Sequence, residues 1–222
     1  MRFNSLALLP FIAGAMMLSA QNCTTPSGSA DSSGEAVAAT ANFTVGDGFI
    51  TVTVQNTQAD PRSAGQLLNG VFFTLSTGPT TGTLGSNSSN IRRVNQGGSF
   101  TDLGPNSTGW ALDNSSGNFF LCVLCTDLGG LGPSHLLIGD PATSGTYASA
   151  NRSIAGNRPH NPFDAGTATF LINVPGLSST ATVTGATFFF STAAPENGPN
   201  GPTGGTSATG SCQGGVGVGL GD

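Results

Sequence analysis

The chain has 222 residues, of which 34 are glycine, 13 are proline and only 8% are charged. All six basic residues are arginine and the net charge is −5, which excludes a Schiff-base lysine, a P-loop lysine and an extensive basic surface for nucleic acid. The 37% of hydrophobic residues is too high for a wholly disordered chain, and the length suits one domain with appendages.

The first twenty residues have the pattern of a secretory signal peptide. Arg2 provides the positive charge, residues 6–18 form an apolar run, and Leu18-Ser19-Ala20 ends in small residues that suit cleavage. The run is shorter than the roughly 20 residues that a membrane span needs. We therefore predict that residues 1–20 are a signal peptide and that residues 21–37 are a flexible leader. Lipidation of Cys23 is the alternative, but Asn22 stands where a lipoprotein has a small residue.

Between residues 38 and 193 the dominant hydrophobic period is two, which is typical of half-buried strands. The clearest case is 49–56, where Ile50, Val52 and Val54 alternate with polar residues, and the glycines just before it suit a hairpin turn. Further strands are predicted at 38–45, 68–77, 108–113, 119–125, 134–138, 166–174 and 181–191, with Gly/Pro turns between them.

Short strands separated by Gly/Pro turns predict an all-β fold with under about 10% helix, against the usual third. The best helical candidate, 62–68, is a single turn. We predict a single antiparallel β-sandwich or jelly-roll-like domain over 38–193, followed by a Gly/Pro-rich disordered tail at 194–222. The apolar runs 71–73 and 188–190 indicate central strands covered on both faces, with edge patches for self-association as the alternative.

Four cysteines remain after cleavage, and in an exported chain this even number indicates disulfides, with three possible connectivities. A bridge between Cys23 and Cys212 would join the two flanking segments without straining a strand. Cys122 and Cys125 have the spacing of a redox motif, but they end a strand-like run rather than open a helix, which favours a structural pair. A zinc site would need two more ligands, and only His135 is near in sequence.

Candidate polar side chains gather in two proline-flanked loops, 132–141 and 155–164. These weak candidates for a polar site are His135, Asp140, Arg158, His160 and Asp164. They lack the spacing of a metal motif, and the chain has no Gly-x-Ser-x-Gly elbow for a Ser-His-Asp site, so turn chemistry explains them best. A paired-acid glycosidase site is also disfavoured, because Glu35 and Glu196, the two glutamates of the mature chain, fall in the predicted flanks. We predict no catalytic, cofactor-binding or metal-ligating residue.

Four segments, NFTVGDGFITVTVQN (42–56), LLNGVFFTLS (67–76), GWALD (109–113) and SIAGNRPHNPF (153–163), resemble bacterial exported Gly/Thr-rich surface proteins that often carry a PEP-CTERM sorting signal. The resemblance covers roughly 40–193 and concerns strands and turns, so it implies a surface location and no activity. The sorting signal itself departs from that pattern: Pro195-Glu196 is followed by neither an apolar span nor an arginine cluster. Release, or another attachment, is therefore expected.

These observations predict a non-catalytic exported protein of the cell surface or extracellular matrix that acts through its domain surface. The expected partners are extracellular polysaccharide or other envelope or matrix proteins, and not nucleic acid or a membrane span. A carbohydrate-binding module is the alternative, with Trp110 and Tyr147 as the candidate aromatic platforms. A cryptic hydrolase is the third class, which would depend on the polar loops.

Overall fold

The computed structural model describes residues 18–125, 131–132, 134–193 and 205–215. These residues form an all-β fold whose one short helix is the 3-10 turn η1 (Ala64–Gln66), within the segment expected to form a single turn. The strands are β1 (Ser19–Thr24), β2 (Ala39–Gly46), β3 (Phe49–Asn56), β4 (Leu68–Leu75), β5 (Thr83–Val94), β6 (Phe100–Asn106), β7 (Ala111–Asp113), β8 (Phe119–Cys122), β9 (Leu137–Ile138), β10 (Phe163–Asn173), β11 (Val183–Phe190) and β12 (Thr206–Gly215).

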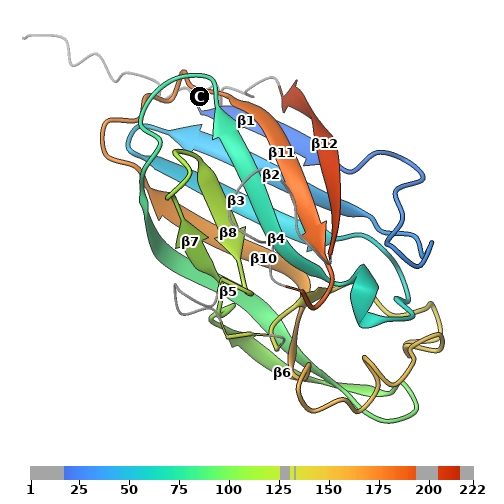
Figure 1. Ribbon diagram of the computed structural model, residues 1–222. Helices are drawn as coiled ribbons and strands as arrows, with labels where there is room; N and C mark the ends of the chain where they lie inside the picture. Colours follow the sequence, from blue (N-terminus) through green and yellow to red (C-terminus); the bar gives the residue numbers. More distant parts are fainter. Residues whose placement is uncertain (1–17, 126–130, 133, 194–204, 216–222) are drawn as a thin grey trace, which may run out of the picture.

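The strands close into a barrel, so the predicted sandwich is wrong in its architecture although the all-β class is confirmed (Figure 1). Going round the ring, the eight barrel strands are β10, β3, β2, β1, β12, β11, β4 and β9. The short strand β9 completes the ring because Leu137 pairs with Leu68 of β4 on one side and with Asp164 of β10 on the other. The β9–β10 pair is parallel, so the sheet is not purely antiparallel either. Period-two alternation predicts which side chains are buried, and it is the same for a sandwich and a barrel.

Alternating side chains fill the interior of this barrel. Ile50, Val52 and Val54 of β3 are fully buried, and the intervening residues are partly exposed. The hairpin that joins β2 to β3 turns through Gly48, whose φ of 81° lies in the left-handed region that favours glycine. Aromatic rings pack across the interior, as in the contact between Phe43 and Phe73, with ring centroids 4.9 Å apart.

A second apolar cluster lies on strands β4, β8 and β11. Phe72, Phe120 and Phe189 bury their rings against one another there, and the centroids of Phe120 and Phe189 are 5.3 Å apart. Phe72 and Phe189 are the middle residues of the two runs predicted to be apolar on both faces, and the coverage of both faces is confirmed.

The ordered domain extends beyond the predicted range of 38–193 at both ends. β1 lies in the predicted signal and leader, and β12 lies in the predicted tail, yet the two strands pair with each other and with β2 and β11. The structure therefore differs from the predicted flexible leader at 21–24, which lies in β1, and from the predicted disordered tail at 206–215, which forms β12. Both strands are poor in apolar side chains, so they are held mainly by ladder hydrogen bonds, which composition does not reveal. The remaining parts of the predicted signal and tail, 1–17, 194–204 and 216–222, lie outside the described residues.

β5 and β6 form a hairpin that leaves the barrel at one end, beside the loop that spans residues 139–162 (Figure 1). Their contact includes a hydrogen bond from the Tyr147 backbone N–H to the Gly98 carbonyl, 2.9 Å long. In the part of the chain that the structure describes, no helix is long and apolar enough to cross a membrane.

Candidate functional site

The hairpin and the loop are fastened together by Arg92. Its guanidinium donates two hydrogen bonds to Asp102 of β6, at 2.6 and 3.0 Å, and a third to the Tyr147 hydroxyl, at 3.0 Å. It also lies 4.0 Å above the ring of Phe100, which is favourable for a cation–π contact. Burial lowers the pKa of Arg92, but the hydrogen bonds to Asp102 and Tyr147 outweigh it, so its pKa is raised and its charge is permanent. The hydrogen bond from Arg92 lowers the pKa of Asp102 in turn.

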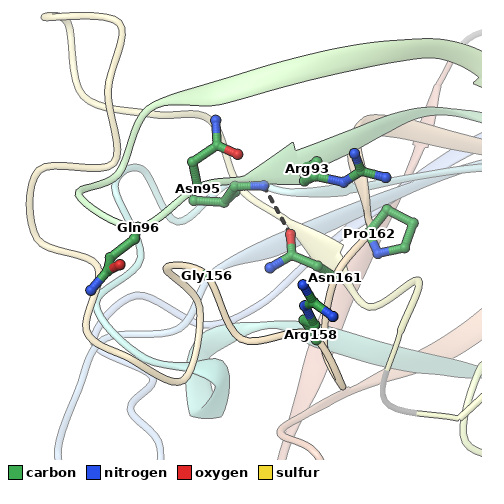
Figure 2. A pocket seen from close by; sticks show the side chains of 8 residues that line it. Arg93, Asn95, Gln96, Gly156, Arg158, Asn161 and Pro162 are labelled. Carbon is green, nitrogen blue, oxygen red and sulfur yellow. Dashed lines mark hydrogen bonds between the residues drawn. The ribbon is translucent and has the colours of Figure 1, made fainter.

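An open groove of about 540 Å³ lies between the end of β5 and this loop (Figure 2). Its wall is fixed by the Asn161 side chain, which accepts a 2.8 Å hydrogen bond from the backbone N–H of Val94. A second link runs from the Gly156 N–H to the Val94 carbonyl, at 3.2 Å. The lining residues are Arg93, Val94, Asn95, Gln96, Gly156, Arg158, Asn161 and Pro162.

Two exposed arginines dominate the charge of the groove. Arg93 comes from β5 and Arg158 from the loop, and Figure 2 shows them on opposite sides of Asn161 and Pro162. An adjoining hollow of about 360 Å³ shares Gln96 and Gly156 with the groove and adds Arg152. Neither hollow has an acidic residue among its lining residues, and none of the three arginines forms an ion pair with a described residue. The groove is therefore a local concentration of positive charge on an acidic protein.

The structure brings His135 and Asp164 together at a different place, the closure of the barrel. His135 Nδ1 lies 3.3 Å from Asp164 Oδ1, and Ser89 donates a 2.6 Å hydrogen bond to the same oxygen. Asp164 has no exposed surface, and its Oδ2 has no hydrogen-bond partner among the described residues. Burial raises the pKa of this carboxyl, although hydrogen bonds from His135 and Ser89 oppose the effect. Because Ser89 bonds to the carboxylate and not to the imidazole, the three residues do not form the relay of a serine hydrolase.

The backbone of His135 is held as firmly as its ring. Its φ of 64° is unusual for a residue other than glycine. Its N–H donates to the Pro162 carbonyl at 2.8 Å, and its carbonyl accepts a 3.0 Å hydrogen bond from the indole N–H of Trp110. The backbone of His135 therefore links the segment before β9 with the residues that precede β7 and β10.

The other predicted polar candidates take separate positions. Arg158 lines the groove, whereas the ring of His160 bonds within its own loop, with Nδ1 2.6 Å from the Ser153 carbonyl oxygen. Asp140 is exposed, and its backbone carbonyl accepts from the Asp60 N–H at 2.7 Å. The five candidates thus do not form one site.

The two aromatic residues predicted as sugar platforms are buried. Trp110 is 4% exposed and packs on Phe170, and Tyr147 is 1% exposed. Their polar atoms are used inside the protein, since the Tyr147 hydroxyl donates to the Gly139 carbonyl at 2.9 Å. The assignment of Trp110 and Tyr147 as exposed platforms is therefore wrong, because each large ring fills the core and finds its polar partner there.

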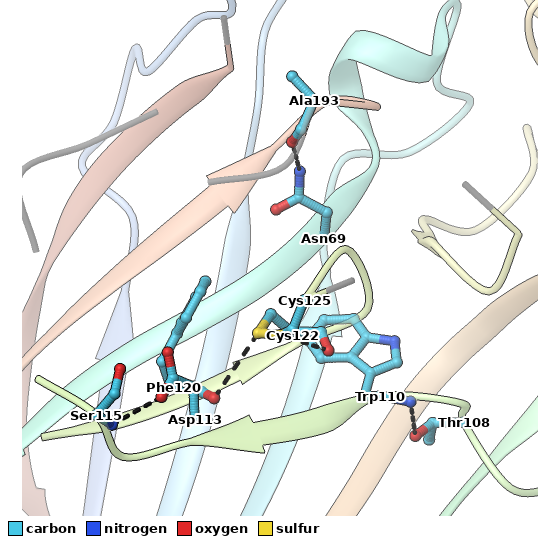
Figure 3. Close-up of a disulfide and its surroundings, with 9 residues drawn as sticks. All are labelled: Asn69, Thr108, Trp110, Asp113, Ser115, Phe120, Cys122, Cys125 and Ala193. Atoms are coloured by element: carbon cyan, nitrogen blue, oxygen red, sulfur yellow. Dashed lines mark hydrogen bonds between the residues drawn. A yellow bond between two sulfur atoms is a disulfide. The ribbon is translucent and has the colours of Figure 1, made fainter. Parts of the chain in front are cut away.

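Both pairs of cysteines form disulfides. Cys23 and Cys212 face each other across β1 and β12, so the predicted bridge exists but joins two barrel strands rather than two mobile segments. Cys122, at the end of β8, is joined to Cys125 (Figure 3). Cys122 is fully buried beside Phe120 in the second apolar cluster, which agrees with a structural pair.

Glu35 is also part of the fold, where it contacts Ser63 and Arg62, and is not in a flexible flank.

The sequence interpretation missed most of the groove. Arg93, Asn95 and Gln96 were not candidates, because β5 and β6 were not predicted as strands. Arg152 was not a candidate either, because it lies before the predicted polar loop 155–164. The available signal was Gly97-Gly98, which lies between a Ser/Asn-rich segment with an arginine pair and a second short strand. Comparison with family models, curated proteins and solved structures finds no match for this chain.

Proposed function

We propose that this protein is a non-catalytic, exported protein of the cell surface or extracellular matrix that acts by binding. The observation that carries the proposal is the lining of the groove, where guanidinium, amide and backbone groups converge. Such groups hold a ligand through hydrogen bonds and charge and are the usual means of orienting a polar ligand in a pocket.

The construction of the barrel supports a role outside the cytoplasm. Two disulfides indicate an oxidising compartment. The bridge between Cys23 and Cys212 links β1 and β12, the strands nearest the two ends of the described chain. Because terminal strands separate from a sheet most easily, this covalent link stabilises the barrel.

The His135–Asp164 pair is best explained as part of the barrel wall. Its groups bond to β5 and to the residues around β9 and β10, so they stabilise the closure of the ring. The groove, and not this pair, is therefore the site at which we place function.

The test is to locate the tagged full chain in cultures of the organism that produces it. We expect recovery in surface washes or matrix, with an N-terminus near Gln21 and all four cysteines oxidised. Recovery from the cytoplasm with Met1 intact would contradict export. Turnover of a defined substrate that is lost in His135→Ala, with the fold intact, would contradict the non-catalytic role.

A further inference from the structure

We infer that the groove between β5 and the loop 139–162 binds an acidic polysaccharide that bears carboxylate or sulfate groups. This inference rests on the proposed binding function and adds the chemical class of the ligand. The strongest reason is that Arg93 and Arg158 line one groove without an acidic neighbour among its lining residues. Guanidinium groups bind carboxylate and sulfate oxygens through paired, charge-assisted hydrogen bonds.

The positive charge extends from the groove into the adjoining hollow. Arg152 lines the adjoining hollow, which shares Gln96 and Gly156 with the first. Three of the six arginines of the chain therefore lie along one continuous surface, while the protein as a whole has a charge of −5. A polymer with charges at intervals would engage this surface at several points, and its affinity would accumulate from them.

The groove is held in shape before any ligand binds. Asn161 fixes the Val94 backbone. Arg92, the neighbour of Arg93 in β5, holds β5 to Asp102 of β6 and to Tyr147 of the loop. Little ordering of the backbone is then needed on binding, which favours affinity. The exposed side chains of Asn95 and Gln96 add donors and acceptors suited to sugar hydroxyls.

Polysaccharide fits this surface better than nucleic acid does. Duplex DNA carries one charge per roughly 1.7 Å and rewards a broad basic face, whereas the groove and the adjoining hollow together offer three arginines on a net acidic molecule. Single strands are held by bases stacked on aromatic rings, and no aromatic residue is among those lining either hollow. A polymer of sugar acids carries its carboxylates on separate sugar rings, so each can pair with a separate guanidinium group.

The experiment measures binding of the full exported chain to polygalacturonate, its fully methyl-esterified form, dextran sulfate, neutral dextran and single-stranded DNA, by calorimetry at low salt. We expect binding to polygalacturonate or dextran sulfate, and which of the two binds more tightly distinguishes carboxylate from sulfate recognition. Arg93→Gln and Arg158→Gln should each weaken binding about tenfold, from the loss of charge-assisted hydrogen bonds. The double variant should weaken it further.

Arg62→Gln is the matched control. Arg62 is also exposed and its replacement changes the net charge by the same amount, but it does not line the groove and lies beside Glu35. We expect an effect of less than about twofold on binding. Unfolding midpoints of all variants establish that the fold is intact.

Three results would overturn the inference. Equal weakening by Arg62→Gln would show that only net charge matters, and tighter binding of DNA would assign the groove to another polymer. Binding of the neutral polymers as strongly as the acidic ones would reject the acidic class, yet the proposed binding function would stand. Failure to bind any polymer would reject the inference, while localisation tests the proposed function separately.

Discussion

His135 Nδ1 lies 3.3 Å from Oδ1 of Asp164, a carboxylate without exposed surface in the strand that β9 joins to close the barrel. His135 precedes β9 by two residues, and Asp164 pairs directly with Leu137. The two side chains thus connect the segment that leads into β9, the shortest strand of the ring, with the neighbouring strand β10.

The buried carboxyl makes stability depend on pH in a defined direction. Because burial raises the folded-state pKa of Asp164 above its ordinary value of 3.8, folding favours the protonated form. The contribution of Asp164 to the free energy of unfolding is fully present below the pKa of the unfolded chain, and it is lost as the pH rises through the pKa of the folded state. Relative to Asp164→Asn, the wild-type chain should lose unfolding free energy as the pH rises from the ordinary pKa of 3.8 through the raised pKa of the folded state, by about 1.4 kcal/mol per unit of pKa elevation. Urea unfolding of both proteins across this range measures the difference, and parallel curves would contradict the assignment.

Arg92 and Tyr147 should be coupled in stability. Tyr147→Phe removes the hydroxyl between the Arg92 guanidinium and the Gly139 carbonyl and leaves both buried groups short of a partner. We expect a loss of about 1–3 kcal/mol. Arg92→Lys should lose a comparable amount, because an ammonium cannot reproduce the paired bonds to Asp102 and the bond to Tyr147 together. Fluorescence of Trp110, the single tryptophan, reports unfolding. Additive losses in the double variant would mean that the two residues act independently.

Hydrophobic alternation predicted much of the barrel wall. The strand predicted at 49–56 has the observed bounds of β3, and the predicted 68–77 and 181–191 contain β4 and β11. These strands carry Val, Ile and Phe with one face buried, so their pattern alone identifies them. The predicted strand at 134–138 contains β9. Closure of the ring was not predictable in this way, because the alternation does not reveal that so short a strand pairs with β4 on one side and β10 on the other.

The missed strands share a composition that period-two patterns do not detect. β12 is TSATGSCQGG and β5 begins TLGSNSS, so neither has an apolar face over most of its length. Their backbones are paired on both sides, which satisfies the polar groups without much side-chain burial. The groove was missed because it depends on β5, whose end carries Arg93, and because only the tertiary fold brings Arg158 to the same groove.

The two disulfides should differ in their effect on stability. The bridge between Cys23 and Cys212 spans 189 residues of sequence, and the chain-entropy model gives it about 5 kcal/mol. The bridge between Cys122 and Cys125 spans three residues and is given about 2 kcal/mol. Because the first bridge joins paired barrel strands, its constraint reaches the folded core. We expect Cys23→Ser/Cys212→Ser to unfold at much lower urea than Cys122→Ser/Cys125→Ser.

Non-reducing peptide mapping of the wild-type chain first establishes the two pairs. A free Cys23 thiol, open to alkylation in the native protein, would contradict the pairing. Equal urea midpoints for the two double variants would contradict the ranking.

Gly139 lies between the strand that closes the barrel and the hydrogen-bonded group formed by Arg92, Asp102 and Tyr147. It follows β9 directly, and its carbonyl accepts the Tyr147 hydroxyl that also contacts Arg92. A Cβ at this position would come far inside van der Waals contact with the backbone carbonyl of Gln58, and a backbone group cannot move aside as a flexible side chain can. Gly139→Ala should therefore cost roughly 1–3 kcal/mol or more by overpacking, and it should also displace the loop that carries Arg158. The control is Gly214→Ala in β12, where an added Cβ meets nothing within 4 Å. Urea unfolding should separate the two variants clearly, and an unchanged midpoint for Gly139→Ala would refute the close approach of β9 to Gln58.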